Sequence, residues 1–337
     1  MTSVYNYTLR ELEDFFISID EKKYRAHQLY DFLYHQKITT FSEVTTFSYD
    51  LINKINDYLT IDRLKIIDKQ ETIDTVKYLF ELNDGHKIET VLMRHNYGNS
   101  ICISTQVGCN MGCLFCESGR LKKVRDLEPA EMVLQILMIQ RELNEHITHV
   151  VIMGIGEPFD NYDNVIKFIK IINDNKGLNI GARRITVSTC GLISQIEAFM
   201  NEPFQVNLAI SLHSAIDNVR SKLMPVNKVY NISKIIEIIK QYIKKTNRRV
   251  TFEYIMLYDI NDSEDDALAL VKLLKGINCY VNLIPYNETS NLDYKKSSKE
   301  RILVFYDILK KNKINVTIRR EFGTTINAAC GQLRSKY

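Results

Sequence analysis

The chain of 337 residues is long enough to bury a substantial core and to form one large domain with a smaller one. Hydrophobic residues make up 45% and charged residues 25% of it, with a formal net charge of +3, which argues against a disordered or fibrous protein and does not by itself indicate a nucleic-acid partner. The N-terminus shows no basic segment followed by an apolar one, and no run reaches the ~18 apolar residues of a membrane span, so we expect a cytoplasmic protein without a membrane partner.

The first part of the chain has a helical pattern. Apolar residues recur at three- and four-residue intervals over 8–19 and 23–36 and again near 48–58, which predicts a small helical accessory domain over residues 1–72. Two runs of β-forming residues follow at 75–82 and 86–93, and the turn sequence Asn83-Asp84-Gly85 lies between them. We therefore expect a β-hairpin extension over residues 73–99.

Strands alternate with helices over residues 100–320, which we expect to form the main domain. The predicted strands are 101–105, 149–153, 184–188, 206–211, 250–256, 280–285 and 315–319, and predicted helices lie between most of them at 129–144, 161–173, 231–245, 263–275 and 298–312. This alternation predicts parallel βαβ units and an α/β fold with a partial (β/α)6 barrel of the TIM-like kind. The functional site of such a barrel lies at the carboxyl ends of its strands.

Three of the seven cysteines follow the first barrel strand within eight residues. An odd number of cysteines in a reducing compartment favours metal binding or catalysis over disulfides. Cys109, Cys113 and Cys116 have the spacing Cys-x3-Cys-x2-Cys, which can hold a four-iron, four-sulfur (4Fe-4S) cluster with one iron left open. S-adenosylmethionine (SAM) can chelate that iron and be cleaved by an electron from the cluster to a 5′-deoxyadenosyl radical. A zinc site is the alternative, but no fourth ligand follows at the expected interval.

A candidate SAM pocket follows from residues at the ends of later strands. Gly156 and Glu157 end the second strand in Met153-Gly154-Ile155-Gly156-Glu157-Pro158, where a glycine lets the backbone approach a ligand and a carboxylate can accept hydrogen bonds from the amino group of SAM. Alone, such residues are ordinary turn or cap residues, and their position after the cluster motif is what distinguishes them. The other expected SAM contacts are Ser188, Ser211, Leu212, His213 and Asn287.

Two further cysteines are candidates for catalysis. Cys102 lies on the strand before the cluster motif, and Cys330 lies near the C-terminus between small residues, in Ala328-Ala329-Cys330-Gly331. A thiolate with small neighbours is accessible and is a good nucleophile for the methyl group of SAM. Cys190 and Cys279 are instead expected to be buried, structural cysteines.

The whole set of motifs closely resembles the bacterial family of adenine carbon-2 methyltransferases that act on 23S ribosomal RNA and on transfer RNA. The resemblance covers residues 75–334. Its segments are Glu89-Thr90-Val91, Cys102-Ile103-Ser104-Thr105-Gln106-Val107-Gly108-Cys109, Met153 to Pro158, Ser188-Thr189, Ser211-Leu212-His213, Asn282-Leu283-Ile284-Pro285 and Ala328-Ala329-Cys330-Gly331-Gln332-Leu333. It implies a radical SAM RNA methyltransferase with one 4Fe-4S cluster that uses two molecules of SAM per turnover.

The resemblance also implies a mechanism. Carbon 2 of adenine is electron-poor and does not attack the methyl group of SAM, so a radical route is needed. In the family's mechanism one SAM methylates the cysteine here numbered Cys330, and the radical from a second SAM removes a hydrogen from the methylated thioether. The resulting carbon radical adds to adenine, and Cys102 resolves the protein–RNA adduct by forming a disulfide with Cys330. Glu89 matches the family's proton acceptor, although a glutamate near a hairpin is usually a surface residue.

The partners implied are 23S rRNA at the peptidyl-transferase centre, tRNA, and an electron donor such as flavodoxin or ferredoxin. The target base has to turn out of its stack into the barrel, and RNA contacts would come from shape and phosphates. The N-terminal helical domain either binds RNA or only caps the barrel. Basic groups are either solvated faces or phosphate contacts: Lys122, Lys123 and Arg125; Arg183 and Arg184; Arg248 and Arg249; Arg319 and Arg320. A monomer is expected.

Two departures from the family pattern bear on the substrate. Glu117 stands where relatives carry a small residue, and Thr324-Thr325-Ile326-Asn327 stands where they carry Asp-Asp-Ile-Asp.

The nearest alternative is the related carbon-8 methyltransferase of the same rRNA adenine, which confers antibiotic resistance and uses the same cysteines. An alternative of another class is a non-catalytic iron–sulfur RNA-binding protein, which would need neither Cys102 nor Cys330.

Overall fold

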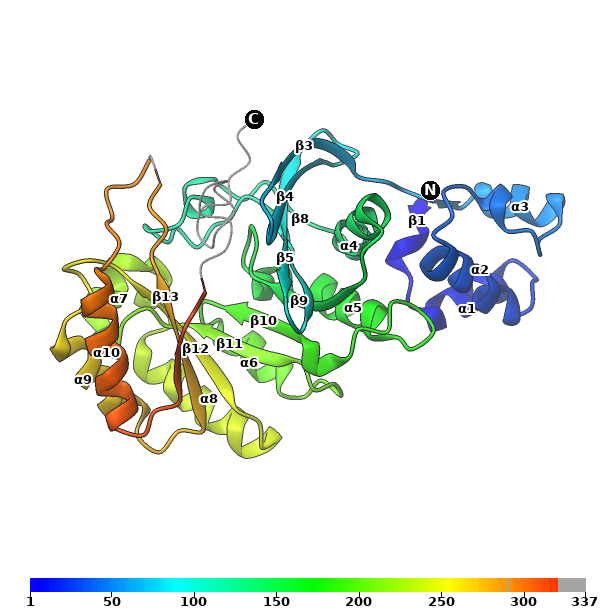
Figure 1. Cartoon of the computed structure of the whole chain (residues 1–337). Helices are drawn as coiled ribbons and strands as arrows, with labels where there is room; N and C mark the ends of the chain where they lie inside the picture. Colours follow the sequence, from blue (N-terminus) through cyan, green and yellow to red (C-terminus); the bar gives the residue numbers. More distant parts are fainter. Residues whose placement is uncertain (290, 321–337) are drawn as a thin grey trace.

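The computed structural model describes residues 1–289 and 291–320, and in these residues ten strands form one mixed sheet in the order β14-β13-β12-β11-β10-β9-β6-β5-β4-β3. Every neighbouring pair from β6 to β14 is parallel, whereas the pairs among β3, β4, β5 and β6 are antiparallel. Figure 1 shows the curved sheet with helices along its outside. The predicted α/β fold with a partial radical-SAM barrel is confirmed.

The barrel follows the predicted alternation closely. Its strands are β6 (Gly98–Cys102), β9 (Ile147–Ile152), β10 (Ile185–Thr189), β11 (Asn207–Ser211), β12 (Val250–Met256), β13 (Cys279–Pro285) and β14 (Val316–Ile318). Its helices are α4 (Pro129–Leu143), α5 (Tyr162–Asn173), α6 (Ile193–Phe199), α7 (Asp217–Leu223), α8 (Ile232–Thr246), α9 (Glu264–Leu274) and α10 (Lys299–Lys311). Helices α6 and α7 were not predicted, because each has only seven residues and so gives little periodic signal.

Three antiparallel strands extend the barrel sheet at the β6 edge. The predicted hairpin is present as β4 (Thr75–Glu81) and β5 (Lys87–His95). The edge strand β3 (Lys65–Glu71) was not predicted, and it lies in the segment for which only helices were expected. Its sequence, KIIDKQE, is mostly charged or polar and only partly buried, as is common for an edge strand that is protected from pairing with other chains.

The N-terminal helices form a small module that projects from one side of the barrel (Figure 1). It contains β1 (Thr2–Ser3), a 3-10 turn η1 (Val4–Asn6), α1 (Leu9–Ser18), α2 (Tyr24–Asp31), a π-helical turn η2 (Phe32–Gln36), a 3-10 turn η3 (Phe41–Glu43), α3 (Tyr49–Asn56) and β2 (Leu59–Thr60). A capping box between Thr8 and Glu11 starts α1, and the buried Leu12 and Phe16 fix its apolar face. The predicted helix over 23–36 is thus an α-helix that ends in a π turn.

Specific hydrogen bonds attach this module to the first turn of α4. The side chain of Asn6 accepts a hydrogen bond from the backbone N–H of Ala130 at 2.8 Å and donates one to Glu128 at 2.7 Å. Arg141, farther along the same helix, donates to the carbonyl of Ile38 at 2.7 Å. The module is therefore attached to α4 at more than one point.

In the described residues no helix is both long enough and apolar enough to cross a bilayer.

Alternation along the barrel strands separates a core face from a polar face. In β10, Ile185 and Val187 are fully buried in the core, whereas Thr186 and Ser188 line cavities inside the barrel. In β12, Phe252 is likewise in the core, and the residues next to it in sequence line the same cavities. Because side chains of a strand alternate between its two faces, this pattern leaves the barrel interior open to a polar ligand.

Candidate active site

The loop that carries the cluster motif is held by a short two-stranded stem. Strand β7 (Gln106–Val107) pairs antiparallel with β8 (Arg125–Asp126). Gly108 follows β7 with a φ of +77°, and a side chain there would clash with the backbone of Lys122. The N–H of Cys109 then donates to the carbonyl of Leu121 at 2.9 Å. The stem therefore fixes where the motif starts.

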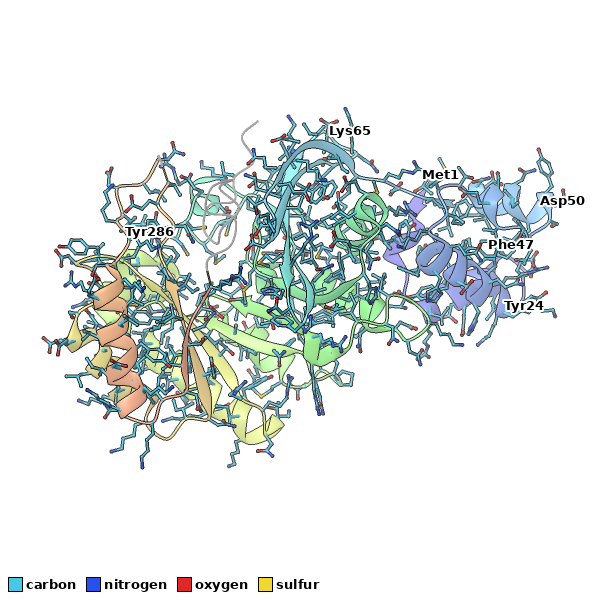
Figure 2. All side chains as sticks on the ribbon, in the orientation of Figure 1. Met1, Tyr24, Phe47, Asp50, Lys65 and Tyr286 are labelled. Atoms are coloured by element: carbon cyan, nitrogen blue, oxygen red, sulfur yellow. The ribbon has the colours of Figure 1, made fainter. Side chains whose placement is uncertain are left out.

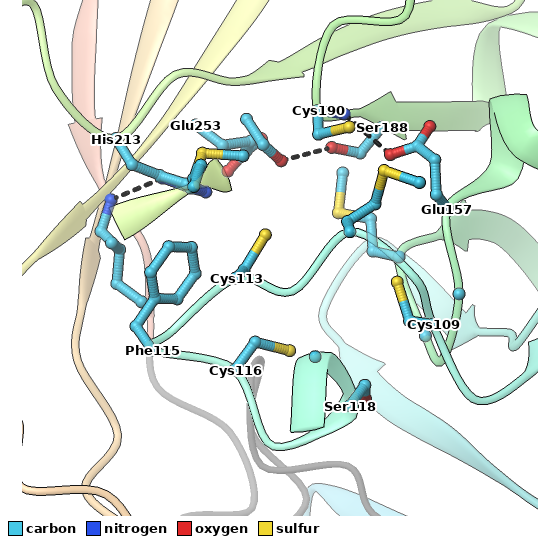
Figure 3. A pocket seen from close by; sticks show the side chains of 18 of the residues that line it. Cys109, Cys113, Phe115, Cys116, Ser118, Glu157, Ser188, Cys190, His213 and Glu253 are labelled. Carbon is cyan, nitrogen blue, oxygen red and sulfur yellow. Dashed lines mark hydrogen bonds between the residues drawn. The ribbon is translucent and has the colours of Figure 1, made fainter. Parts of the chain in front are cut away.

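The three motif cysteines line one pocket at the carboxyl ends of the barrel strands (Figure 3). The pocket has a volume of about 950 Å³, counting the space at its mouth. Burial raises the pKa of Cys109 to about 12 and raises the pKa of Cys113 well above its ordinary value, so both thiols need a cationic group to become thiolates. In the described residues no three His, Cys, Asp or Glu side chains converge on a position for a single metal ion. In a 4Fe-4S cluster each thiolate binds a different iron, so sulfurs spread over a pocket wall suit a cluster.

The Gly-Ile-Gly-Glu segment forms another wall of this pocket. Gly154 packs against the backbone of Ile103, and Gly156, with a φ of +109°, packs against Gln106, so neither position has room for a side chain. The buried carboxylate of Glu157 accepts hydrogen bonds from the N–H of Cys190 at 2.8 Å and from the N–H of Phe159 at 3.1 Å. Burial raises the pKa of Glu157 despite these bonds. The carboxylate is thus fixed in position and lies next to the cluster cysteines, where it can accept a ligand ammonium.

Polar residues from β10 and β11 meet at the wall of the pocket next to Glu157. The hydroxyls of Ser188 and Ser211 lie 3.4 Å apart. His213 has a left-handed backbone with a φ of +59°, and its Nδ1 accepts a hydrogen bond from the N–H of Ile255 at 3.1 Å. Because Nδ1 accepts, the proton of the neutral ring is on Nε2. The ring stands edge-on to Phe115 of the cluster loop, with 4.9 Å between centroids, as Figure 3 shows.

Two of the expected SAM residues do not line this pocket. Leu212 is fully buried, and its contribution is its carbonyl, which accepts a hydrogen bond from the side chain of Arg220 at 3.0 Å. Asn287 is also buried, and within residues 1–289 and 291–320 its side-chain oxygen has no hydrogen-bond partner. A buried amide oxygen without a partner is costly, so Asn287 suits a ligand donor such as the amino group of adenine.

Cys102 and Glu89 lie on one face of neighbouring strands. Cys102 pairs with Val91 across β6 and β5, and Glu89 is two residues before Val91, so the three side chains share that face. Cys102 packs with Val91 and Ile155, and Met153, which lines the pocket, packs against this group. Glu89 is not a surface residue, because it forms a buried ion pair with Lys77 at 3.1 Å. The sequence segments around Cys102 and Glu89 therefore meet beside the pocket, whereas Cys330 lies outside the described residues.

The pocket contains residues that sequence reasoning missed. Glu253 on β12 lines it, is buried, and accepts a hydrogen bond from Asn282 at 2.8 Å. Burial also raises the pKa of Glu253. Cys190, expected to be structural, is buried and lines the pocket directly after β10. The signal for Glu253 was a charged residue within the otherwise apolar strand TFEYIM.

Arg220 on α7 is a second missed residue, and it joins three of the loops around the pocket. Its fully buried guanidinium donates to the carbonyls of Cys190 at 2.7 Å and Ser211 at 3.1 Å, and to the side chain of Asn227 at 2.6 Å. Burial lowers its pKa. The contacts satisfy the guanidinium and fix the carboxyl ends of β10 and β11 against α7. An unpredicted short helix thus positions predicted site residues.

Comparison with known proteins agrees with this geometry. The model of the radical SAM superfamily matches residues 103–271, and the model of the ribosomal RNA large subunit methyltransferase N-terminal domain matches residues 2–61. The chain is 52% identical over 340 residues to a protein of Spiroplasma citri named "Probable dual-specificity RNA methyltransferase RlmN", an alignment that covers 100% of this chain and 98% of the relative. The chain belongs to the RlmN family of dual-specificity RNA methyltransferases. This confirms the resemblance inferred from its motifs.

Other relatives agree with the RlmN assignment. A protein of the same name from Streptococcus sanguinis is 53% identical over 342 residues, covering 99% of this chain and 94% of the relative. The crystal structure of a radical SAM methyltransferase from Sphaerobacter thermophilus superposes with a TM-score of 0.95 at 40% identity and covers 99% of both chains. As a radical SAM enzyme of the RlmN family, the protein is a SAM-dependent methyltransferase with a 4Fe-4S cluster.

Proposed function

We propose that this RlmN-family protein methylates carbon 2 of an adenine in 23S rRNA at the peptidyl-transferase centre, and an adenine in tRNA, through a methylated cysteine. The observation that supports it most is the shared pocket, which Cys109, Cys113 and Cys116 line together with the buried carboxylate of Glu157. When bound there, the cluster supplies the electron that cleaves SAM. One SAM provides the methyl group and a second provides the radical, so two are used per turnover.

The chain's own residues have distinct roles in this proposal. Cys109, Cys113 and Cys116 hold the cluster. Glu157 accepts the ammonium of SAM, with the backbone at Gly156 close to the ligand. Ser188, Ser211 and His213 contact the ribose and the methionine part, the segment at Leu212 sets their spacing, and Asn287 accepts from the adenine. Pocket lining supports the roles of Gly156, Glu157, Ser188, Ser211 and His213. Asn287 and Leu212 do not line the pocket, and their roles are supported by the unpartnered buried amide oxygen of Asn287 and by the place of Leu212 between Ser211 and His213.

Three residues carry the chemistry on RNA. Cys330 receives the methyl group, and Cys102 resolves the adduct by forming a disulfide with Cys330, which releases the product. Glu89 accepts the proton that leaves carbon 2. The shared face of Cys102 and Glu89 beside Met153 supports these roles, because both side chains are directed to the side of the sheet on which Met153 lines the pocket.

The N-terminal module supplies RNA contacts in this proposal. At its end remote from the barrel, the guanidinium of Arg25 lies 5.0 Å from the ring centre of the exposed Tyr24 and 5.5 Å from that of Phe47 (Figure 2). Planar cationic and aromatic groups of this kind stack on unpaired bases.

We propose residues 1–72 as the RNA-binding accessory domain, 73–99 as the β extension, 100–320 as the catalytic barrel and 321–337 as the carrier segment. The enzyme would act in the cytoplasm as a monomer.

Mass spectrometry of RNA digests tests this function. Expression of the chain in cells that lack 2-methyladenosine should restore that nucleoside in 23S rRNA and tRNA, and Cys330→Ala should abolish it. Cys102→Ala should instead trap a covalent protein–RNA adduct, because the carrier can add to the base but cannot be released. Appearance of 8-methyladenosine would assign the carbon-8 reaction, and no methylated base with an unmodified Cys330 would favour a non-catalytic RNA-binding protein.

A further inference from the structure

The cluster loop has a second face, turned away from the SAM pocket. Cys113, Phe115 and Cys116 line the pocket, whereas Leu114 between them does not and is 49% exposed. Leu114 therefore points away from the side of the loop on which Cys113 and Phe115 line the pocket. At this point a single layer of the chain separates the cysteines from solvent.

Two neighbouring segments extend this outward face. The N–H of Leu114 donates to the carbonyl of Leu223, the last residue of α7, at 2.9 Å. Gly112 lies beside Pro225, since a Cβ at Gly112 would be 3.7 Å from the ring. The 3-10 turn η7 (Pro225–Lys228) then leads to Val229, which is 61% exposed. On the other side, the segment that leads from the loop to β8 lies against Cys109, whose N–H donates to the carbonyl of Leu121.

Lysines accompany these segments: Lys122 follows Leu121 in the cluster loop, Lys222 precedes Leu223, and Lys228 precedes Val229. We define the outer loop face as Leu114, Lys122, Lys222, Lys228 and Val229, all of which are exposed. In the described part of the chain none of its three lysines forms an ion pair. The nearby carboxylate of Asp217 is already engaged, because it accepts from Asn227 and from the N–H of Ile232, each at 3.1 Å. Three exposed lysines therefore lie in or next to the segments that carry Leu114 and Val229, against one nearby carboxylate whose oxygen is hydrogen-bonded within the chain.

We propose that the outer loop face docks an acidic electron-donor protein, one that carries a flavin or an iron–sulfur centre within a negatively charged surface. The inference rests on the proposed function in one respect, namely that Cys109, Cys113 and Cys116 hold a cluster. The donor loses one electron and the cluster gains it, so its net charge becomes more negative by one, with no bond made and no proton moved. Small, weakly bound and charge-steered interfaces are typical of electron-transfer partners.

The position of this face explains why the donor docks here rather than at the pocket. Electron transfer slows steeply with distance, and the outer loop face is separated from the cysteines only by the loop itself. The pocket side is needed for SAM and for RNA, and an acidic donor and the phosphates of RNA repel each other there. Docking on the outward face lets the cluster be reduced while the substrate stays bound.

Stopped-flow reduction of the cluster-loaded chain tests the inference. The probe is a flavodoxin reduced to its hydroquinone, and the readout is bleaching of the cluster's visible absorbance in the absence of RNA. The double variant Lys222→Glu/Lys228→Glu should slow reduction by flavodoxin roughly tenfold or more at low ionic strength, and the difference should shrink as salt is added. Reduction by dithionite should be unchanged in the same variant, since dithionite needs no docking surface.

The matched control is Lys240→Glu/Lys244→Glu on α8, which makes the same charge change on exposed residues away from the cluster loop in Figure 1. It should reduce at the wild-type rate with both reductants. Equal flavodoxin rates for the two double variants would overturn the inference, as would a loss of RNA affinity in Lys222→Glu/Lys228→Glu with normal reduction, which would make the face an RNA contact. Failure of the unsubstituted chain to bind a cluster would overturn the proposed function as well, so the two failures are distinguishable.

Discussion

Lys77 on β4 and Glu89 on β5 form an ion pair at 3.1 Å with side chains only 8% and 5% exposed. Removing one partner of a buried pair leaves the other charge without compensation, which is far more costly than losing a surface pair. Lys77→Met should therefore lower the free energy of unfolding by about 3 kcal/mol, measured by urea denaturation.

The control for this prediction is in the same antiparallel extension, between β3 and β4. Lys65 and Glu81 form a pair at 3.3 Å whose side chains are 72% and 30% exposed, so Lys65→Met should cost less than about 1 kcal/mol. Equal losses for the two variants would contradict the buried-pair argument.

Glu157→Gln should weaken SAM binding about 10- to 100-fold, because the carboxylate supplies a charge-assisted hydrogen bond to the ligand ammonium. Equilibrium dialysis on the cluster-loaded protein measures it. Glu197→Gln on the exposed side of the neighbouring helix α6 is the control and should bind SAM normally. Unchanged affinity in the Glu157 variant would place the ammonium elsewhere in the pocket.

The free energy of unfolding should decrease as the pH falls below about 6.5, because His213 is buried in its neutral form. Burial, with a smaller effect of Arg220, lowers the pKa of His213 from 6.5 to about 3. Between these values the unfolded chain binds a proton that the folded chain does not, so stability is lost as the pH falls through this window, by about 2 kcal/mol at pH 5.

Urea midpoints at pH 7.5 and pH 5 for the wild type and His213→Asn measure this effect. Asparagine tolerates the left-handed backbone, so the variant should fold and should lack the His213 part of the acid loss. The pKa values of Glu157 and Glu253 are raised by burial and act in the opposite direction, but they do so in both proteins. If the urea midpoints of both proteins change equally with pH, protonation of His213 does not destabilise the fold, which would contradict the prediction.

Glu253 should bind the sugar of SAM. Its carboxylate lies on β12, on the other side of the pocket from Glu157, and is oriented by Asn282 at 2.8 Å, so it can accept from the ribose hydroxyls. Glu253→Gln should reduce the affinity for SAM and for 5′-methylthioadenosine by a similar factor, about tenfold, and leave methionine binding unchanged. Loss of methionine binding instead would assign Glu253 to the amino-acid part.

The parts of the structure that were predictable depend on local patterns in the chain. The β12 prediction, 250–256, matches the observed strand, because its run of β-forming residues begins directly after Arg248 and Arg249. Two walls of the pocket were also predictable from local patterns, namely the cysteine spacing and the Gly-Ile-Gly-Glu segment. Strand β3 was not predicted, since its polar sequence resembles a loop and no local pattern shows that it pairs with β4.

The remaining features depend on contacts between distant segments. Glu89 is buried only because Lys77 lies on the adjacent strand, and no local pattern reports that pairing. Arg220 looks like a surface residue of a short helix until the carbonyls of Cys190 and Ser211 are placed around it. Whether Leu212 or Asn287 lines the pocket likewise depends on loop paths that sequence spacing does not determine.

The first turn of α4 is a shared mechanical support. Asn6 holds it from the N-terminal module, and on its other side Arg125, in the stem of the cluster loop, pairs with Glu131 at 2.8 Å. A force that a bound macromolecule exerts on the N-terminal helices therefore acts on the same turn of α4 that holds the stem of the cluster loop. Contacts made by the N-terminal module and the position of the cluster loop are consequently coupled through less than two turns of α4.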